Sequence, residues 1–259
     1  SFIVVFCTLV SLTTAYDVLA DDKKSLHQYY DSTEIADLDE EDVNDPLESF
    51  NRFVFKFNEF LQSFFLKPVA SLYNENVPAV FRAGVGNVLS NLVAPVTVAN
   101  QLLQGDHEAA VRSIGRFVVN STVGIAGIVD VSSELGDAGR SEDFGQTLGF
   151  WGAGEGFYLV LPVFGPSSPR DAIGKFLVDS YFDPFGMWIS NTDQTDLYWG
   201  QKVVDGVSEY AEHVDDLDQM RKTSVDYYAV IRSLYRQKRK SEITNGNIST
   251  STRSPGIAK

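Results

Sequence analysis

The chain has 259 residues, of which 44% are apolar and 12% aromatic, with 18 Phe against only 2 Met. This apolar content is enough to bury a sizeable core, so the chain as a whole is not disordered. The formal net charge is −14 and no basic face is evident before the extreme C-terminus, which argues against a nucleic-acid-binding role.

The first twenty residues have the pattern of a secretory signal peptide. Residues 1–13 (SFIVVFCTLVSLT) are mostly apolar, and Val18-Leu19-Ala20 then precedes two aspartates, as in an h-region followed by a cleavage site. The apolar stretch is shorter than the roughly 20 residues that a bilayer-spanning helix needs. We therefore expect residues 1–20 to direct export and then to be removed, with a short buried helix as the alternative.

Cys7 is the only cysteine, so no intramolecular disulfide can form. A lone cysteine near an exported N-terminus suits lipid attachment, but Phe6 directly before it is a poor match to lipoprotein signals. Two interpretations stay open: lipidation at Cys7, or a cysteine without a role in a segment that is removed.

The acidic charge is concentrated near the start of the chain. Residues 21–49 hold eleven acidic residues and two lysines, a net charge of −9. Such a run is typical of a solvated leader, and we expect residues 21–43 to be disordered. The segment 241–259 is rich in Ser, Thr, Asn and Gly and is also expected to be disordered, which leaves 44–240 as the folded region.

The folded region opens with a strong helix signal. Asp45 is expected to cap the helix, with Pro46 at its first position and Glu48 completing a capping box. Proline disfavours helical geometry in the residue before it, so Pro68 is expected to end the helix. Apolar residues recur in steps of three and four, and further phenylalanines widen the stripe: Leu47, Phe50, Val54, Phe57, Leu61 and Phe64, then Phe53, Phe60 and Phe65. A helix that is apolar on nearly all sides must be buried in protein or in lipid, and periodicity alone leaves both open.

Further helices are expected at short intervals along the rest of the chain. Pro95 divides one apolar segment into two predicted helices, and Asp106 is expected to cap the next. We find no run of eighteen apolar residues and expect no conventional membrane-spanning helix. The predicted helices are 80–91, 95–104, 107–119, 169–179, 195–213 and 215–240.

One glycine-rich segment and one β-like run interrupt this pattern. The sequence GFWGAGEG places Gly149, Gly152, Gly154 and Gly156 within eight residues, which predicts a flexible or tightly turning loop. Residues 157–164 (FYLVLPVF) are the only β-like run, and the proline within it argues against a central strand.

No catalytic or cofactor motif is present. The sequence lacks the nucleophile-elbow, zinc-protease and phosphate-loop patterns, and its three histidines are far apart, which argues against a zinc site. His107 lies between Asp106 and Glu108, with Ser113 on the same predicted helix, so a hydrolase using His107 is an alternative. We favour the simpler interpretation that these carboxylates complement a helix dipole. No enzyme activity, metal or cofactor is expected.

Seven stretches, in order along the chain, resemble the MlaA (VacJ) family over roughly residues 44–240. They are DPLESFNR from Asp45, LKPVA from Leu66, NQLLQG from Asn100, RFVVNSTVG from Arg116, DFGQTLG from Asp143, YLVLP from Tyr158 and GPSSPRD from Gly165.

The resemblance implies a mainly α fold: a single ring-like bundle of amphipathic and broken helices, embedded in the periplasmic leaflet of the outer membrane, with little or no β structure. It also implies removal of mislocalised phospholipids from the outer leaflet through a polar channel, and their transfer to a periplasmic lipid-carrier protein, which maintains lipid asymmetry. A trimeric porin is the implied partner. A porin-associated structural protein without transport is the alternative, and the poor lipid-attachment signal leaves the family's usual anchor open.

The resemblance gives the phenylalanines their expected role, and residue chemistry gives the glycines and the charged motif residues theirs. The helix surface of Phe50, Phe53, Phe57, Phe60, Phe64 and Phe65 is expected to face lipid. The glycine segment with Gly149, Gly152, Gly154 and Gly156 is expected to gate the channel, with a plain surface turn as the alternative. The motif residues Asp143, Gln146, Arg170 and Asp171 are expected to be architectural. Arg170 is the predicted pivot, because buried charges need partners and guanidinium can bind carboxylates bidentately.

Overall fold

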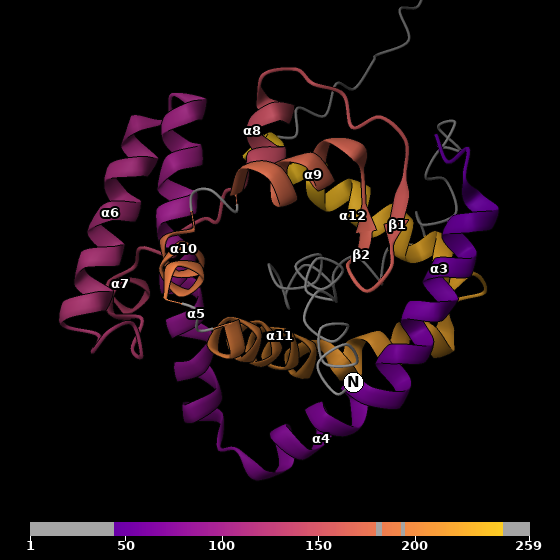
Figure 1. Cartoon of the computed structure of the whole chain (residues 1–259), viewed down its shortest axis with the longest axis horizontal. Coiled ribbons are helices and arrows are strands. Elements are labelled where there is room, and N and C mark those ends of the chain that lie inside the picture. The colour runs from indigo at the N-terminus through magenta and orange to yellow at the C-terminus, as the bar shows by residue number, and fades with distance from the viewer. Residues whose placement is uncertain (1–43, 180–182, 193–194, 246–259) are drawn as a thin grey trace, which may run out of the picture.

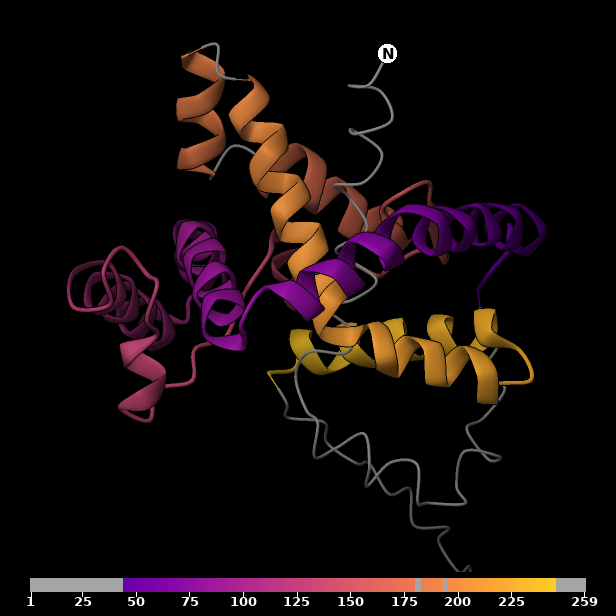
Figure 2. The same ribbon diagram turned by 90° about the horizontal axis from the view of Figure 1, so that it is seen from below.

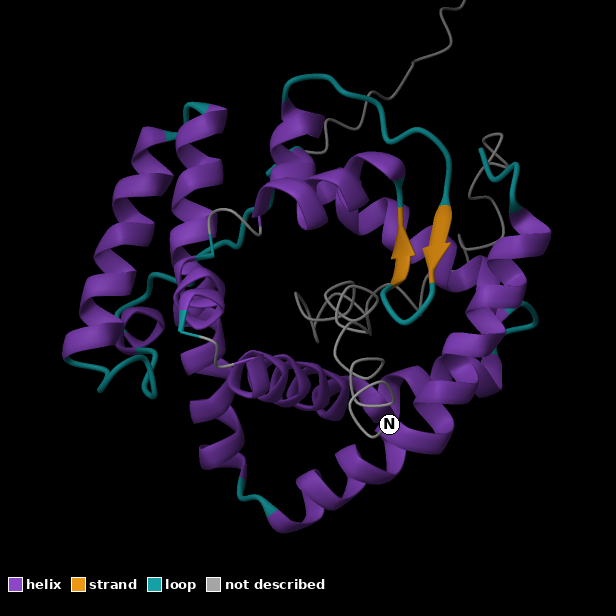
Figure 3. Cartoon of the chain, in the orientation of Figure 1, coloured by secondary structure: helices purple, strands orange, loops and turns teal. Residues whose placement is uncertain are grey.

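The computed structural model describes residues 44–179, 183–192 and 195–245. The predicted signal peptide (1–20), Cys7 and the predicted leader (21–43) lie outside the described residues, as does most of the predicted tail. The described residues form helices and one two-stranded antiparallel sheet (Figure 3), so the mainly α fold class is confirmed.

The helices follow a ring-like circuit (Figure 1). The circuit begins with α3 (Glu48–Leu61), the π-helix η3 (Gln62–Leu66), α4 (Lys67–Asn76) and α5 (Ala79–Gln104). The remaining elements are α6 (His107–Thr122), α7 (Val131–Glu134), α8 (Phe144–Phe150), β1 (Leu159–Leu161), β2 (Gly165–Ser167), α9 (Pro169–Ile173), the π-helix η4 (Gly174–Val178), α10 (Pro184–Asn191), α11 (Thr195–Thr223) and α12 (Tyr227–Ile243).

The elements are stacked in levels when the ring is seen edge-on. Figure 2 shows α3, α4 and α5 in one layer, with α12 on one side of it and α10 with the start of α11 on the other. The helix α6 lies beside α5 at the outside of the ring (Figure 1). The first half of the chain therefore forms a flat helical band, and the C-terminal helices cross and support it.

The start of α3 differs from the prediction. The helix begins at Glu48 and has no side-chain cap. The carboxylate of Asp45 instead accepts hydrogen bonds from Asn51 Nδ2 at 2.8 Å, the Tyr228 hydroxyl at 2.5 Å and Arg232 at 2.8 Å. Asp45 thus ties the beginning of α3 to α12, a use that local sequence could not indicate because the partners are 183 and 187 residues away.

Pro68 does not end the first helix, contrary to expectation. It lies in the first turn of α4, and helical structure is continuous from Glu48 to Asn76. The N–H of Lys67 bonds to the carbonyl of Gln62, five residues back, as in a π-helix. The wider π turn moves the preceding carbonyls relative to the proline ring, so the ring is accommodated without breaking the helix.

Pro95 likewise does not divide α5, so the two helices predicted there are one. The side chains of Asn87 and Asn91 bond to Ile128 and Ser121 beside α5, at 3.0 and 2.9 Å, and support this part of the helix. Among the described residues, α5 is the one helix whose length and composition would allow it to cross a membrane, and little of it is buried. The expectation of no such helix was based on the absence of an unbroken run of eighteen apolar residues, whereas α5 meets the criterion by its average hydropathy.

The single β-hairpin lies against α3. Leu159 pairs with Ser167, and Leu161 pairs with Gly165, so Pro162 follows the last paired residue of β1 and starts the turn. Two asparagines of α3, Asn51 and Asn58, each bond to the hairpin backbone with both ends of the amide, at 2.7 to 3.0 Å. The helix therefore completes hydrogen bonding along the edge of β1.

The hydrophobic core lies where α3, α4, β1, α11 and α12 meet, and it is rich in tyrosine. Its fully or nearly fully buried members include Leu66, Val160, Tyr210, Tyr228 and Tyr235. The break predicted between 213 and 215 is wrong, because α11 continues through this core to Thr223 and Asp226 caps α12. The helix α12 also continues to Ile243, three residues beyond the predicted folded region.

Candidate functional site

The amphipathic pattern of α3 is inverted relative to that of a helix in a soluble protein. Its buried face carries Asn51 and Asn58, which are 0% and 2% exposed, beside Val54 and Phe55. The buried asparagines are fully used by the hairpin backbone, as described above. The other four phenylalanines of α3 occupy the opposite face: Phe50, Phe53, Phe57 and Phe60 are all exposed, as is Phe64 of η3, with Phe53 at 70%.

Phe65 differs from the other five predicted membrane-facing residues. It is half-buried, packs against the core and meets the Phe64 ring edge-on at 4.8 Å. Adjacent residues of a helix point in different directions, so Phe64 is exposed while Phe65 turns toward the core. Five of the six predicted positions therefore lie on one open surface, and Phe65 does not.

The exposed apolar surface continues on the elements that follow α3 in the same layer. Removing each large apolar side chain from water is worth about 1.5–3 kcal/mol, and large exposed apolar patches mark contacts with protein or membrane. The exposed residues are Val69 and Leu72 of α4, Val80, Phe81, Leu102 and Leu103 of α5, and Val111, Ile114, Phe117 and Val118 of α6.

The motif residues of α8 and α9 meet at a cation that the sequence did not reveal. Arg239 of α12 binds Asp143 with two nitrogens at 2.7 and 2.9 Å and Asp171 at 2.9 and 3.1 Å. Burial alone would favour the neutral acids, but the charge of Arg239 outweighs it and holds the pKa of both carboxyl groups below the usual range. The pivot of this cluster is therefore Arg239, not Arg170.

Arg170 occupies a secondary place in this cluster. Its Nε bonds to Asp171 at 2.9 Å and its Nη1 to the Ala153 carbonyl at 3.3 Å. Gln146 donates its backbone N–H to Asp143 at 2.8 Å, so Asp143 also caps α8. Arg239 is 96 residues from Asp143 in sequence, which is why no local pattern pointed to it.

A second polar cluster, also missed from the sequence, joins α5 to α8 and the end of η4. The Asn100 amide contacts Thr147 at 2.9 Å and Asp179 at 3.0 Å, and the Gln104 amide contacts Glu142 at 2.9 Å. Burial, and then the nearby charge of Asp143, raise the pKa of Asp179 to about 6. Asn100 and Gln104 belong to the NQLLQG stretch, so that stretch fixes the ring between α5 and α8.

The glycine-rich segment is only partly a loop. Gly149 lies within α8, and a Cβ there would come within 2.6 Å of Ile243, so this glycine permits close packing of α8 on α12. Gly152 and Gly156 have φ angles of +89° and +82°, which favour glycine. Gly154 is exposed and unrestricted. The remaining loop, 151–158, follows the outside of the ring (Figure 1), and a gating role for it stays a prediction.

The geometry gives little support to the alternative of a hydrolase that uses His107. Asp106 caps α6 by accepting from the Ala109 N–H at 2.9 Å, as predicted. His107 is exposed at the start of α6, whereas Ser113 is buried one and a half turns later. Within the described part of the chain, no three His, Cys, Asp or Glu side chains are grouped so that they could hold a metal ion.

Comparison with known proteins gives a consistent match. The family model described as MlaA lipoprotein matches residues 43–242. The intermembrane phospholipid transport system lipoprotein MlaA of Escherichia coli (strain K12) is 32% identical over 212 residues, covering 80% of this chain and 81% of that protein. Its counterpart in Haemophilus influenzae is 29% identical over 208 residues, covering 79% and 81% of the two chains.

The match extends to an uncharacterised relative and to a solved structure. A protein of Rickettsia bellii is 32% identical over 242 residues, covering 93% of this chain and 92% of that protein. A structure from work on the structural basis for maintenance of bacterial outer membrane lipid asymmetry superposes with a TM-score of 0.67 at 33% identity, covering 77% of this chain and 98% of that one.

Proposed function

This chain belongs to the MlaA lipoprotein family, and on that premise we propose that it moves phospholipids between membranes. In this proposal it removes mislocalised phospholipids from the outer leaflet of the outer membrane and delivers them to a soluble periplasmic carrier. The proposal requires no covalent step, which agrees with the lack of a catalytic motif in the sequence.

The observation that carries the proposal is the inverted face of α3. Asn51 and Asn58 are buried and bonded to the hairpin, while four of the five phenylalanines of α3 are exposed. A protein in water would lose the benefit of burying those rings, whereas acyl chains would cover them. We therefore place the layer of α3, α4 and α5 in the hydrocarbon of one leaflet, with these helix axes along the membrane plane (Figure 2).

The ring supplies a physical reason for transport. A phospholipid that changes leaflet must carry its charged headgroup through hydrocarbon, where an unpaired charge costs at least several kcal/mol. A protein ring that is apolar outside and offers polar groups inside would reduce that cost. We propose the periplasmic leaflet as its location and a trimeric porin as its outer-membrane partner, as the family resemblance implies.

The test is to delete the gene and measure phospholipid exposed on the cell surface, with the wild-type gene restored as control. Transport from the outer leaflet predicts more surface phospholipid on deletion and a return to normal on restoration. Unchanged surface phospholipid, with a porin that loses stability, would instead support the structural alternative.

A further inference from the structure

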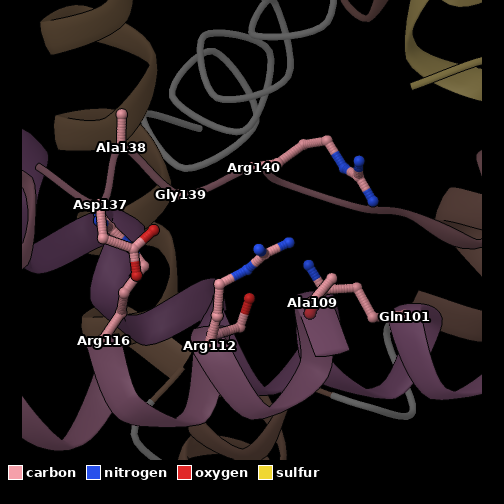
Figure 4. Close-up of a pocket in the computed structure, with 9 residues that line it drawn as sticks. Gln101, Ala109, Arg112, Arg116, Asp137, Ala138, Gly139 and Arg140 are labelled. Carbon is pink, nitrogen blue, oxygen red and sulfur yellow. The ribbon is translucent and has the colours of Figure 1, made fainter. Parts of the chain in front are cut away.

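The helices α5 and α6 and the linker before α8 enclose a pocket rich in arginine. It has a volume of about 170 Å³ and is lined by Arg112 and Arg116 of α6 and Arg140 of the linker, together with the buried Gln101 of α5. Figure 4 shows these side chains around one space. Asp137 is the acidic residue of the lining.

Arg140 pairs with Glu142 at 2.6 Å and with Asp106 at 3.3 Å, whereas Arg112 and Arg116 keep unused donors. Among the described residues, Arg112 pairs with Glu108 alone, at 3.1 Å, and both side chains are more than half exposed. Arg116 reaches Asp130 through Nη2, at 3.1 and 3.2 Å, while its buried Nη1 has no partner within the described structure. A guanidinium has five N–H donors, so both residues can bind a further anion.

Two other residues shape the pocket. The amide of Gln101 is 1% exposed, and its oxygen finds no hydrogen-bond partner among the residues described. A Cβ on Gly139 would lie 2.4 Å from Nε of Arg116, so the glycine backbone packs directly on that guanidinium. The site is therefore held in place by close packing, and it contains a buried polar group that a ligand would satisfy.

We infer that this pocket binds the phosphate of a phospholipid headgroup, an inference that rests on the proposed lipid transport. Planar guanidinium groups bind phosphate oxygens through paired hydrogen bonds. The Gln101 oxygen and the Asp137 carboxylate offer acceptors for the ammonium group of an ethanolamine headgroup. Val111 and Ile114 are exposed on another face of α6, so the pocket is assigned to the headgroup phosphate and not to the acyl chains.

The test measures binding of phosphatidylethanolamine to the full chain in detergent. Arg112→Gln removes one donor group from an exposed ion pair, and Gly139→Ala displaces Arg116. Each should weaken binding about tenfold, the effect of losing one charge-assisted hydrogen bond. Diacylglycerol, which lacks the phosphate, should bind at least tenfold more weakly than phosphatidylethanolamine to the wild type.

The matched controls are Gly115→Ala, where a Cβ meets nothing within 4 Å, and Arg236→Gln. Arg236 lies in α12 and pairs with Glu155 of the loop after α8. Both should bind like the wild type. Unchanged binding in Arg112→Gln and Gly139→Ala, or equal binding of diacylglycerol, would overturn the pocket while leaving lipid transport in place.

A third binding measurement, with inorganic phosphate, tests whether the pocket binds free phosphate instead of a phospholipid. Inorganic phosphate that binds as tightly as the lipid, depends on Arg112 and is not displaced by phosphatidylethanolamine would overturn the lipid assignment. A wild type that binds no phospholipid at all would count against the proposed function itself.

Discussion

At the scale of single residues, the most consequential side chain is Arg239. It neutralises two carboxylates on two different elements, Asp143 before α8 and Asp171 in α9, and it is itself largely buried. Removing one partner of a buried ion pair leaves the others without compensation, which costs more than the pair contributes. The fold between α8, α9 and α12 therefore depends on this guanidinium.

Arg239→Leu should lower the free energy of unfolding by about 3–5 kcal/mol, because Asp143 loses its cation and the buried Asp171 keeps only Arg170. Arg170→Leu should cost less, since Asp171 keeps Arg239. Arg236→Leu is the control and should cost less than about 1 kcal/mol, because its ion pair is partly exposed. Thermal unfolding in detergent ranks the three variants by stability. A larger loss of stability in Arg170→Leu than in Arg239→Leu would contradict the prediction.

The ionisation of Asp179 predicts that the folded protein becomes less stable as the pH rises. Its pKa is raised to about 6 in the fold, above the value of about 4 for a free aspartate. The folded protein therefore binds this proton more tightly than the unfolded chain does. The stabilisation is complete below about pH 4 and is lost as the pH rises through 6.

Asp179→Asn imitates the protonated acid and keeps an oxygen that accepts from Asn100 and the Phe144 N–H. The variant should therefore unfold with a free energy about 2–3 kcal/mol higher than the wild type at pH 8, and the difference should disappear near pH 4. Paired melting curves across this range check it. A difference that stays constant with pH would show that the carboxyl group does not titrate as described.

At the scale of elements, α3 shows what periodicity can and cannot reveal. The three-and-four spacing correctly predicted a helix with a broad phenylalanine surface. It could not say which face is buried, because Asn51 and Asn58 look like a solvent-facing stripe until the hairpin backbone is placed beside them. For a similar reason, Pro68 was predicted to end one helix and Pro95 to separate two others. Rules for proline in a local sequence do not include the π turn or the packing of α6 on α5.

The inverted face predicts opposite effects for two substitutions on the same helix. Asn51→Leu unpairs the backbone of Tyr158 and Val160, each buried group costing about 1–3 kcal/mol, and should destabilise the protein strongly. Phe53→Gln should leave the melting temperature nearly unchanged but weaken partition into phospholipid vesicles. If Phe53→Gln instead unfolds the protein and Asn51→Leu does not, the assignment of the two faces is wrong.

The loop after α8 offers a comparison between two exposed glycines. Gly152 needs its positive φ and Gly154 does not, so Gly152→Ala should destabilise the turn by about 1–2 kcal/mol while Gly154→Ala should be neutral. If the loop gates a lipid path, Gly154→Pro should change surface phospholipid at unchanged protein level. If Gly154→Pro cells show the same amount of surface phospholipid as the wild type, the loop is a plain surface turn and not a gate.

At the scale of the whole molecule, the order of seven short stretches was enough to predict the family and the mainly α fold. It was not enough to predict how the ring is fastened. Hydrogen bonds between distant segments hold the ring together: Asp45 to α12, Asn100 to Asp179, and Asp143 to Arg239. Each pair combines ordinary polar residues that have no recognisable spacing in the sequence.

The flat layer of α3, α4 and α5 connects this architecture to transport. Many of its large apolar side chains are exposed, Asn51 and Asn58 are buried against the hairpin, and its helices lie in one plane (Figure 2). Such a layer suits the proposed immersion in one leaflet better than burial in a second protein copy, because the exposed residues extend over five successive elements, from α3 to α6.

The most direct test of transport is to follow a fluorescent phospholipid in vesicles that contain the purified protein. The labelled lipid starts in the leaflet away from the solution, and a soluble periplasmic lipid carrier from the same organism is added outside. We predict that lipid reaches the carrier at least tenfold faster than from protein-free vesicles. Equal rates with and without the protein, at verified insertion and folding, would contradict the account.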